Sequence, residues 1–485
     1  MNAPPTRTVA GRRPGGGARD TVILGAGLAG LTAGSLVSRS GAGVTVVERD
    51  PAVGGLARTV EHNGFRFDLG GHRFHTENSS VDKLVRSILG RNVLAVDRSS
   101  KILMAGRYFD YPWRPVNALA GLGVGTAAAV LFSFTVEQIR QRIDRRQAVS
   151  FEDEIVRRFG RTMFDIFVRD YSEKVWGVPC RRLARELAEW RIQGLSVRTA
   201  LRDMLFARNR GTVRTLARKF LYPPLGIGQL ADGLRRRIDE SGQVLTDTAV
   251  TGLHHSDGRI ESVALRHDGR MRLKHAGEFA SSIPLSALVR LLDPKPPEDI
   301  LEAAASLRFR DLLVVAVMID RPRVTDQTWI YVPEREIPFG RIHEPTNWSR
   351  HMAPDGKTLL VTEHFCFRGD DRWCTDDDTL VEETVANLDS LGLIRRHEVI
   401  DSLVLRVPDA YPLFDIGHDE RRRRICDYLA RFENLEVIGR GGMFRYFNMD
   451  HAMESGIAAA QAIIARNARD RRHERDARAV AEACR

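Results

Sequence analysis

Two short apolar runs lie near the start of the chain and are separated by a segment of helical length. Residues 21–24 (TVIL) and 44–47 (VTVV) are apolar or β-branched throughout, and residues 28–39 between them are mostly small and apolar. Short continuous apolar runs are typical of strands buried on both faces of a parallel sheet, where a crossover helix joins each strand to the next. The pattern therefore predicts a strand–helix–strand unit over residues 21–47.

Further along, the spacing of apolar positions changes twice. Residues 106–235 carry apolar side chains three or four positions apart, which predicts amphipathic helices. From residue 242 the period becomes two, and Ser256-Asp257-Gly258 predicts a tight hairpin turn. A last apolar run at 435–440 and a helical pattern at 451–464 are expected to return to the first sheet.

These changes predict a mixed α/β protein whose Rossmann-like nucleotide-binding domain is built from three separate stretches. A chain of 485 residues exceeds what one hydrophobic core usually supports, so a helical substrate domain and a mixed-sheet substrate domain are expected as insertions. The three stretches of the nucleotide-binding domain are expected at 20–105, 236–290 and 431–466. The helical domain (106–235) and the sheet domain (291–430) would lie between them, with a disordered tail (1–19) and a charged tail (467–485) at the ends.

Three glycines follow the first predicted strand at the spacing of a dinucleotide-binding turn. Gly25 allows the tight turn, Gly27 lets the backbone approach a pyrophosphate, and Gly30 lets the helix pack closely on the strand. The N–H groups at the start of the helix would then face the phosphates. Glu48 ends the second strand, where a carboxylate can bind the ribose hydroxyls and disfavours a 2′-phosphate.

A second glycine pair distinguishes between cofactors. Gly54 and Gly55 follow the acid closely and precede Arg58. This arrangement resembles the second phosphate-contacting turn of the flavoproteins with two dinucleotide-binding domains, so FAD is expected in preference to NAD. The resemblance also implies cofactor contacts from a returning strand and from the C-terminal region of the chain. The full set of expected FAD contacts is Gly25, Gly27, Gly30, Glu48, Arg49, Gly54, Gly55, Arg58, Gly71, Val250, Gly439, Arg440 and Met449.

Composition narrows the function classes. The net charge is +10, but only seven of the 73 basic residues are lysines, which suggests a coding bias toward arginine more than a selected patch. No nucleic-acid-binding motif accompanies the charge, so no nucleic acid partner is expected. The five cysteines are scattered without metal-ligand spacing, which predicts neither a metal site nor disulfides and fits a cytoplasmic protein.

One stretch raises the question of a membrane. Residues 116–134 carry no charge and are followed by a basic segment. The stretch is diluted by Gly, Ala and Asn, so a buried or surface-docking helical element is expected in preference to a span. Peripheral contact with a membrane stays open, and the oligomeric state is not predicted.

Several motifs resemble the UDP-galactopyranose mutases, which belong to a wider clan with flavin amine oxidases, protoporphyrinogen oxidases and carotenoid desaturases. They are LGGHRFHT (69–76), VRDYSEKVWG (168–177), GRIHEPTNWS (340–349), AYPLFD (410–415) and GRGGMFRYFNMD (439–450). The resemblance implies roles for the residues at matching positions. His72 or His75 would lie at the flavin ring, Tyr171 and Trp176 would embrace a uracil and ribose, and Arg341, Tyr411, Arg440 and Tyr446 would bind the substrate diphosphate.

This resemblance implies an enzyme that interconverts the pyranose and furanose forms of a nucleotide sugar. In such enzymes N5 of reduced FAD attacks the anomeric carbon, the nucleotide diphosphate leaves, and the sugar ring opens and recloses. The implied catalytic residues are His72, His75, Arg341, Tyr411 and Tyr446. The implied substrate contacts are Tyr171, Trp176, Arg198, Arg341, Tyr411, Arg440, Tyr446 and Asn448.

Two departures from the mutases keep other functions open. The segment RIQGLSVR (191–198) carries Arg198 where a mobile loop should supply an arginine, but its spacing differs, and Asn448 replaces a usual aspartate. The segment 220–234 resembles the amine-oxidase and desaturase branch more than the mutases. An FAD-dependent oxidoreductase acting on an amine, polyprenyl chain or tetrapyrrole is therefore the alternative, and an inactive FAD-binding scaffold is a third hypothesis.

Overall fold

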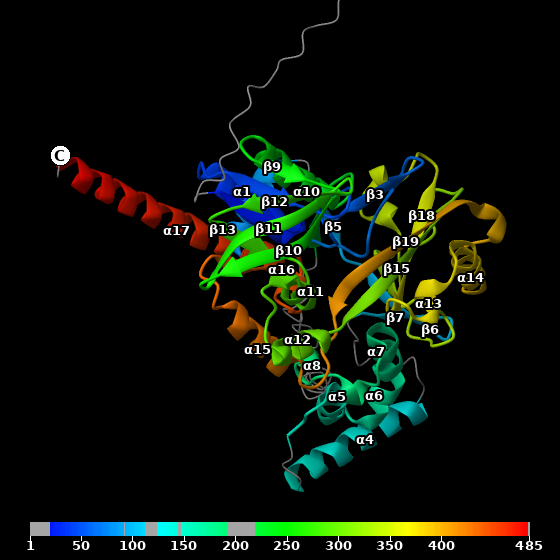
Figure 1. Cartoon of the computed structure of the whole chain (residues 1–485). Coiled ribbons are helices and arrows are strands. Elements are labelled where there is room, and N and C mark those ends of the chain that lie inside the picture. The colour runs from blue at the N-terminus through cyan, green and yellow to red at the C-terminus, as the bar shows by residue number, and fades with distance from the viewer. Residues whose placement is uncertain (1–19, 92, 112–123, 144–146, 192–218, 484–485) are drawn as a thin grey trace, which may run out of the picture.

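The computed structural model describes residues 20–91, 93–111, 124–143, 147–191 and 219–483. Its organising element is a five-stranded parallel sheet in the order β20-β13-β1-β2-β9 (Figure 1). These strands come from three regions of the chain, as the sequence predicts: β1 (Thr21–Leu24), β2 (Val44–Val47), β9 (Gln243–Leu245), β13 (Glu278–Ser281) and β20 (Leu435–Val437).

The two faces of this sheet are covered differently. Ile23 and Val46 pack against a helical layer made of α1 (Leu28–Arg39), α10 (Gly228–Asp239) and the long α17 (Met449–Ala483). Val22 and Leu24 share a core with a second sheet and its helices. That sheet runs β12-β11-β10-β14, and its elements are β10 (Thr248–Ser256), β11 (Arg259–His267), β12 (Arg270–His275), α11 (Leu285–Leu291), β14 (Leu292–Asp293) and α12 (Glu298–Ala305).

A seven-stranded sheet runs in the order β19-β15-β18-β17-β16-β6-β7. Its strands are β6 (Ser100–Met104), β7 (Arg107–Asp110), β15 (Phe309–Ile319), β16 (Trp329–Tyr331), β17 (Arg341–His343), β18 (Thr358–Cys366) and β19 (Val399–Pro412). One face packs on α14 (Asp377–Ser390) through Leu380, Val385 and Leu388. The short α13 (Asp371–Cys374) lies just before α14.

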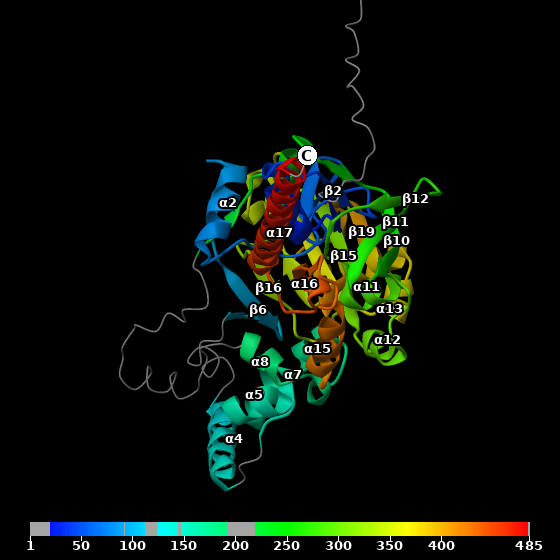
Figure 2. The same ribbon diagram turned by 60° about the vertical axis from the view of Figure 1, so that its left-hand side comes forward.

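A small helical unit lies at the far end of the molecule from the five-stranded sheet (Figures 1 and 2). It contains α4 (Val124–Ile143), α5 (Phe151–Phe159), α6 (Arg161–Phe167), α7 (Arg169–Trp176) and α8 (Glu186–Arg191). Within the described ranges, none of the helices combines the length and apolar character that a membrane span requires.

The remaining elements connect these units. They are β3 (Thr59–His62), β4 (Phe65–Asp68), α2 (Ser79–Leu89), β5 (Leu94–Asp97), β8 (Lys219–Tyr222), α15 (His418–Leu429), α16 (Gly439–Gly442) and the 3₁₀ turns Cys180–Arg182, Pro345–Asn347, Arg350–Met352 and Arg396–Glu398.

The mixed α/β class and the hairpin are confirmed, because β10 and β11 pair antiparallel around Asp257 and Gly258. Both turn residues have positive φ, 47° and 74°, as a type I′ turn requires.

The domain limits differ from the prediction at three places. Strands β6 and β7 belong to the seven-stranded sheet, because β6 pairs in parallel with β16, so the first nucleotide-binding stretch ends before residue 100. Helix α10 packs on α1 and belongs with the nucleotide domain. The expected charged tail continues α17 as far as Ala483, whereas the expected tail at 1–19 lies outside the described residues.

Candidate functional site

The first glycine turn is closed at two positions and open at a third. Gly25 has a φ of +98°, and a Cβ on Gly30 would lie 2.0 Å from the Gly25 carbonyl oxygen, so neither position accepts a side chain. A Cβ on Gly27 would meet no atom within 4 Å. Gly27 immediately precedes α1, and no side chain caps the first N–H groups of this helix. This is the geometry that a pyrophosphate at a helix N-terminus needs.

The second glycine pair lies directly against the first turn. The Gly54 N–H donates to the Ala26 carbonyl oxygen over 2.8 Å, and a Cβ on Gly55 would lie 3.2 Å from the Gly27 Cα. Two glycine turns therefore form one cradle. Of the arginines predicted beside it, Arg58 forms an ion pair with Asp50 at 3.1 Å, and Arg49 is mostly exposed.

Glu48 is fixed at the end of β2 by backbone donors. Its two carboxylate oxygens accept from the N–H groups of Ala26 (2.8 Å) and Asp50 (3.1 Å). The Thr248 N–H donates to the Glu48 carbonyl oxygen, which brings β10, and with it Val250, to this edge of the sheet. The open space at Gly27, the paired glycine turns and the positioned carboxylate together fit the adenosine diphosphate moiety of FAD.

We expect Glu48→Ala to weaken FAD binding by roughly 1.5 to 3 kcal/mol, about ten- to 150-fold, because charge-assisted hydrogen bonds to the ribose are lost. Titrating apoprotein with FAD measures the change. Glu420→Ala, an exposed acid on α15, is the matched control and should leave the affinity unchanged. Equal affinities for all three proteins would show that Glu48 only caps the strand.

A buried carboxyl group holds the next loop in position. Asp68, at the end of β4, accepts from the Thr59 hydroxyl (2.6 Å), the Tyr222 hydroxyl (2.7 Å) and the Ile227 N–H (3.2 Å). Burial raises the pKa of Asp68 to about 7 although these three donors oppose the rise. The network ties β4 to β8 and to the start of α10, and it thereby fixes Leu69 to Gly71, the start of the loop that the sequence places at the flavin ring.

That loop packs against a tryptophan. A Cβ on Gly71 would lie 1.5 Å from the Trp329 ring, so only glycine fits. The next residue, His72, donates from Nδ1 to the Gly70 carbonyl oxygen over 3.0 Å, which leaves Nε2 as an acceptor. Burial and the nearby Arg440 charge lower the pKa of His72 to about 4, so the ring is neutral at pH 7. His75 is exposed, so of the two predicted histidines His72 is the one in the site.

Arg341, on β17, sits among the residues predicted with it and one that was not predicted. Its guanidinium donates to the hydroxyls of Tyr171 (3.0 Å) and Tyr411 (3.2 Å) and to the Glu363 carboxylate (3.0 Å). Glu363 is fully buried, and the Arg341 side chain is 11% exposed. Burial alone would lower the pKa of Arg341, but these three partners raise it well above the usual range. Much of the Arg341 charge is therefore balanced within the protein.

Arg440 differs from Arg341 because its hydrogen bonds to described residues go to carbonyl groups. It donates to the carbonyl oxygens of Phe447 (2.7 Å) and Ala410 (3.2 Å), and its guanidinium lies 5.2 Å from the centre of the Tyr411 ring. Among the described residues it forms no ion pair. The structure therefore brings Arg341 and Arg440 together at Tyr411, as predicted, and gives Arg440 no acidic partner in the part of the chain that it describes.

Of the other residues predicted to bind substrate, Tyr446 lies in an aromatic stack and Trp176 lies in the core. Tyr446 stacks on Trp190, with ring centres 6.2 Å apart. Trp176 is 1% exposed and packs edge-on against Tyr411 and Phe414, so its predicted stacking on a base is wrong for this conformation. The apolar spacing on α7 points Trp176 into the core.

Three further positions complete the predicted set. Asn448 is exposed, and Met449 begins α17. The Gly439 N–H donates to the Ser455 hydroxyl over 2.9 Å, and a Cβ on Gly439 would lie 3.1 Å from the Ala29 Cβ, so this glycine packs tightly on the nucleotide domain. Arg198 lies outside the described residues.

Lys174, in the same motif as Tyr171, has a structural role. The Lys174 ammonium donates to the carbonyl oxygens of Val332 (2.9 Å), Ile337 (2.9 Å), Phe339 (3.2 Å) and Glu334. These bonds fasten α7 to the loop before β17, and so hold Tyr171 against Arg341.

Sequence reasoning missed two features of the site. Glu363 is the one carboxylate in the fully buried strand TLLVTEHFC, and a lone carboxylate in a buried strand is a signal for a buried partner. Trp329 stacks on His343 (5.4 Å), which stacks on Trp348 (5.0 Å). Both ring nitrogens of His343 are buried without a hydrogen-bond partner among the described residues, and burial lowers its pKa to about 3.

His343 should make the protein sensitive to acid. Its folded-state pKa lies below the unfolded value of 6.5. The contribution of neutral His343 to the unfolding free energy is therefore fully present above pH 6.5 and is lost as the pH decreases toward 3. Replacing it by Phe keeps a flat ring in the stack. We expect His343→Phe to remove a slope of about 1.4 kcal/mol per pH unit from urea unfolding between pH 6 and 4. His364, whose pKa burial also lowers to about 3, remains in the variant, and its share of the slope should persist. A slope in His343→Phe that equals the wild-type slope would contradict this assignment.

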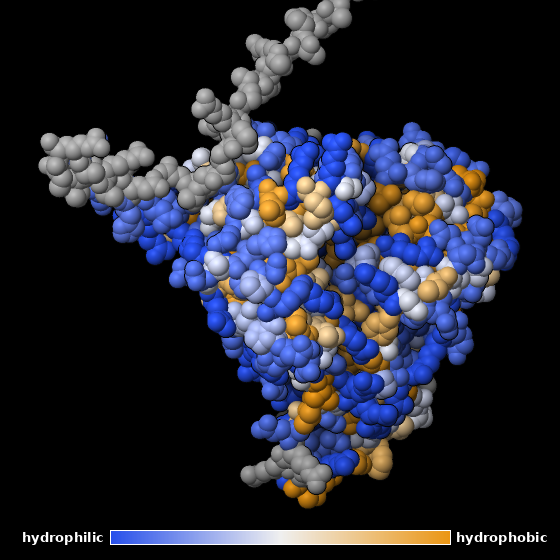
Figure 3. Space-filling view, in the orientation of Figure 1, coloured by the Kyte–Doolittle hydropathy of each residue, from blue (hydrophilic) through white to orange (hydrophobic). Residues whose placement is uncertain are grey.

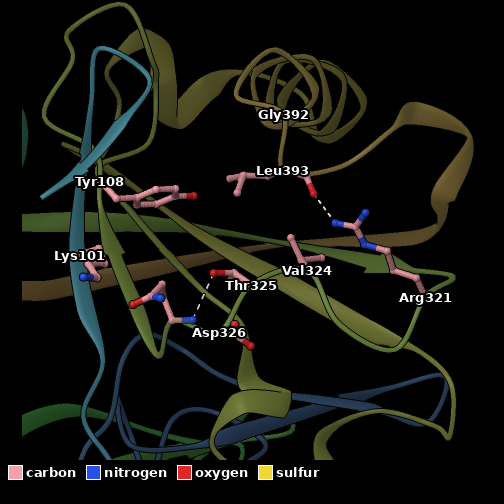
Figure 4. Close-up of a pocket in the computed structure, with 9 residues that line it drawn as sticks. Lys101, Tyr108, Arg321, Val324, Thr325, Asp326, Gly392 and Leu393 are labelled. Carbon is pink, nitrogen blue, oxygen red and sulfur yellow. Dashed lines mark hydrogen bonds between the residues drawn. The ribbon is translucent and has the colours of Figure 1, made fainter.

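A separate polar pocket of about 630 Å³ opens beside β6 (Figure 4). Lys101 lies 2.5 Å from Asp110, Arg321 lies 3.2 Å from Glu398, and Arg323 lies 2.9 Å from Asp326. The charges at this pocket are already balanced inside the protein, and none of the predicted site residues lines it. Across the described segments of the chain, no cluster of His, Cys, Asp or Glu is arranged to hold a metal ion.

A comparison with protein families now decides the class. The model of the flavin containing amine oxidoreductases matches residues 28–464. The chain belongs to this family. Membership implies FAD as the cofactor, in agreement with the glycine cradle, and makes the protein a flavin-dependent enzyme.

Two curated relatives match this flavoenzyme over a short stretch. The inactive all-trans-retinol 13,14-reductase of Danio rerio is 43% identical over 51 residues, which are 10% of this chain and 8% of that protein. The carotenoid 3,4-desaturase of Haloarcula japonica is 39% identical over 51 residues, 10% of this chain and 10% of that protein. The matched stretch thus spans about a tenth of these relatives.

Solved structures resemble the flavoenzyme over nearly its whole length. A reduced UDP-galactopyranose mutase superimposes with a TM-score of 0.80 at 21% identity, covering 92% of this chain and 94% of the mutase. A putative protoporphyrinogen oxidase from Exiguobacterium superimposes with a TM-score of 0.72 at 18% identity, covering 93% and 100%. A putrescine oxidase superimposes with a TM-score of 0.62 at 16% identity, covering 92% of this chain and 99% of that oxidase. At these identities the likeness establishes the shared fold.

Proposed function

We propose that this FAD enzyme acts on a phosphate-bearing substrate, and that its reaction is the interconversion of pyranose and furanose forms of a nucleotide sugar. The supporting observation is the excess of positive charge around the loop at Gly71. Arg440 contributes to the low pKa of His72, and Arg73 and Arg341 contribute to that of His343. Glu363 is the buried carboxylate that balances some of this charge. Such a site attracts a diphosphate and repels a cationic amine.

Each residue then has a task that its position allows. Bound FAD, in its reduced state, would supply the nucleophile. Arg440 would bind phosphate oxygens, and the hydroxyls of Tyr171 and Tyr411, held by Arg341, would orient the substrate beside the flavin ring. Neutral His72 would offer Nε2 as a hydrogen-bond acceptor. The free thiols of Cys180, Cys366, Cys374 and Cys426 support a cytoplasmic setting.

A second candidate is an FAD-dependent oxidoreductase. The aromatic cluster of buried Trp176 and Phe414 and partly buried Trp190 and Tyr446 favours it, because such a wall suits an apolar substrate. The ion pair of Arg341 with Glu363 also favours this candidate, because it leaves less positive charge to bind a phosphate.

Turnover under two redox conditions distinguishes the two candidates. Holoprotein is incubated with a panel of UDP-hexoses, once oxidised and once after reduction with dithionite. The mutase proposal expects furanose product from the reduced enzyme only, with no stoichiometric consumption of reductant. Hydrogen peroxide released in proportion to turnover, or no conversion of any UDP-hexose by reduced enzyme, would favour the oxidoreductase.

A further inference from the structure

Two arginines near the loop at Gly71 converge on one hydroxyl group. Arg73 lies in that loop, and Arg98 precedes β6. The Arg73 Nη1 atom is 3.4 Å from the Ser100 Oγ, and the Arg98 Nε atom is 3.3 Å from the same oxygen. Ser100 is 7% exposed. Two guanidinium groups thus donate to the same nearly buried hydroxyl oxygen and lie close to each other.

Carboxylates balance this pair only in part: the charge of Arg73 opposes the rise in pKa that burial causes at Glu363. Neither Arg73 nor Arg98 forms an ion pair with a described residue, whereas Arg66 and Arg86 on neighbouring elements each bind an acid. Burial lowers the pKa of Arg98, and the Arg73 charge lowers it further. Like charges at close range are unfavourable unless an anion is placed between them.

Aromatic rings connect the pair with the candidate site. The Arg73 guanidinium lies 5.2 Å from the centre of the Trp329 ring, on which Gly71 packs. The Arg98 guanidinium lies 5.5 Å from the ring of Tyr111, which contacts Tyr331 at 4.4 Å. Tyr331 meets Tyr171 edge-on at 5.6 Å. Both arginines are therefore joined through side-chain contacts to the surroundings of Arg341.

We infer that Arg73, Arg98 and Ser100 form a phosphate subsite that receives a phosphoryl group of the substrate in addition to Arg440. The inference deepens the proposed function and rests on it for the identity of the substrate, but the anion site itself rests on the arginine pair. A phosphoryl group can accept hydrogen bonds from both guanidinium groups and from the hydroxyl. The chemistry fits either a free phosphate compound or the diphosphate of a nucleotide.

Calorimetric titration of FAD-loaded protein with inorganic pyrophosphate and with UDP tests the subsite. Arg73→Met and Arg98→Met should each weaken pyrophosphate binding at least tenfold. Arg66→Met, which removes a partly buried arginine already paired with Glu61, is the matched control and should bind like wild type. Without ligand, loss of Arg73 or Arg98 should leave the melting temperature unchanged or higher, because repulsion is relieved.

The outcomes separate this inference from the proposed function. Pyrophosphate binding that depends on Arg73 and Arg98, without conversion of any UDP-hexose, keeps the subsite and removes the mutase. Conversion of a UDP-hexose with an unchanged KM in both variants keeps the mutase and overturns the subsite. Variants that bind pyrophosphate like wild type, or that lose stability without ligand, also overturn it.

A different observation concerns the surface of α4. Phe132, Val136, Ile139 and Ile143 are 73%, 46%, 53% and 81% exposed, and their spacing of four, three and four residues places them on one helix face. The stripe lies at the tip of the helical unit, where Figure 3 shows hydrophobic surface at the lower end of the molecule. Isolated exposed apolar residues are common, but a continuous stripe marks a contact surface.

The charges beside the stripe select the partner. Arg140 and Arg142 flank it and are exposed, and the acid of this helix segment, Glu137, is partly buried. We propose that this face binds the surface of a membrane rich in anionic lipids, with the apolar side chains in the interface and the arginines among the headgroups.

Flotation with vesicles tests this contact. Wild type should float with phosphatidylglycerol-containing vesicles, more weakly with pure phosphatidylcholine, and Phe132→Ser/Ile139→Ser should reduce partitioning at least tenfold. Met271→Ser/Leu273→Ser removes two equally exposed apolar residues from β12 and should change nothing. Flotation of the α4 variant like wild type overturns the proposal. A lipid-free dimer that this variant dissociates also overturns it, because the stripe would then join two copies.

Discussion

Gly27→Asp should yield a stable, colourless protein. In the structure Gly27 has a φ of −73° and a ψ of 175° and directly precedes α1 without a side-chain cap. Aspartate is a favoured N-cap residue, so the substitution should leave folding intact or stabilise it by up to about 1 kcal/mol. The same carboxylate would occupy the open space at the helix N-terminus and repel a pyrophosphate. The ratio of absorbance at 450 and 280 nm after reconstitution with FAD measures the loss.

The neighbouring glycine gives the matched comparison. A Cβ on Gly30 would lie 2.0 Å from a backbone oxygen, so Gly30→Ala should lose several kcal/mol of folding stability, seen as a large fall in the melting temperature. Gly27→Asp that binds FAD like wild type would show that the cradle does not hold the pyrophosphate.

The two arginines at Tyr411 should respond in opposite ways to substitution. Arg341→Met leaves the fully buried Glu363 without its cation, which should cost about 3–5 kcal/mol of unfolding free energy. Adding Glu363→Gln should recover much of that loss. Arg440→Met removes no ion-pair partner among the described residues, so it should have a small effect on stability but weaken UDP binding at least tenfold.

Urea unfolding and UDP titration of the three variants measure both effects, with the flavin content as the control for cofactor loss. Equal destabilisation by Arg341→Met and Arg440→Met, or no rescue by Glu363→Gln, would show that the Arg341–Glu363 pair does not hold the buried strands together.

How far the sequence predicts this molecule depends on whether the determining contacts are local. The first glycine turn follows from residues close together in the chain, because a positive φ at Gly25 and the close approach at Gly30 are local requirements. The turn at Asp257 and Gly258 is predicted for the same reason. Strand period and crossover rules then place β1 and β2 correctly.

Contacts between distant segments were not predictable in this way. The Arg341–Glu363 pair depends on the pairing of β17 with β18, and the placement of β6 depends on Trp329 and its neighbours more than 220 residues later. The motif that contains Trp176 is compatible with a tryptophan in the core and with one that stacks on a base. In the folded chain Trp176 packs against Phe414 and lies in the core. The position of Arg98 beside Arg73 likewise appears only in the folded chain.

Recognition of a nucleoside diphosphate by the positive site beside the loop at Gly71 can be measured without knowing the sugar. Equilibrium dialysis of UDP against FAD-loaded wild-type protein, oxidised and reduced, is that measurement. We expect saturable binding of one UDP per flavin, displaced by UDP-sugars and weakened at least tenfold by Arg440→Met at unchanged flavin content. Absence of saturable UDP binding in both redox states, with flavin present, would refute nucleotide recognition at this site and leave the oxidoreductase as the function to test.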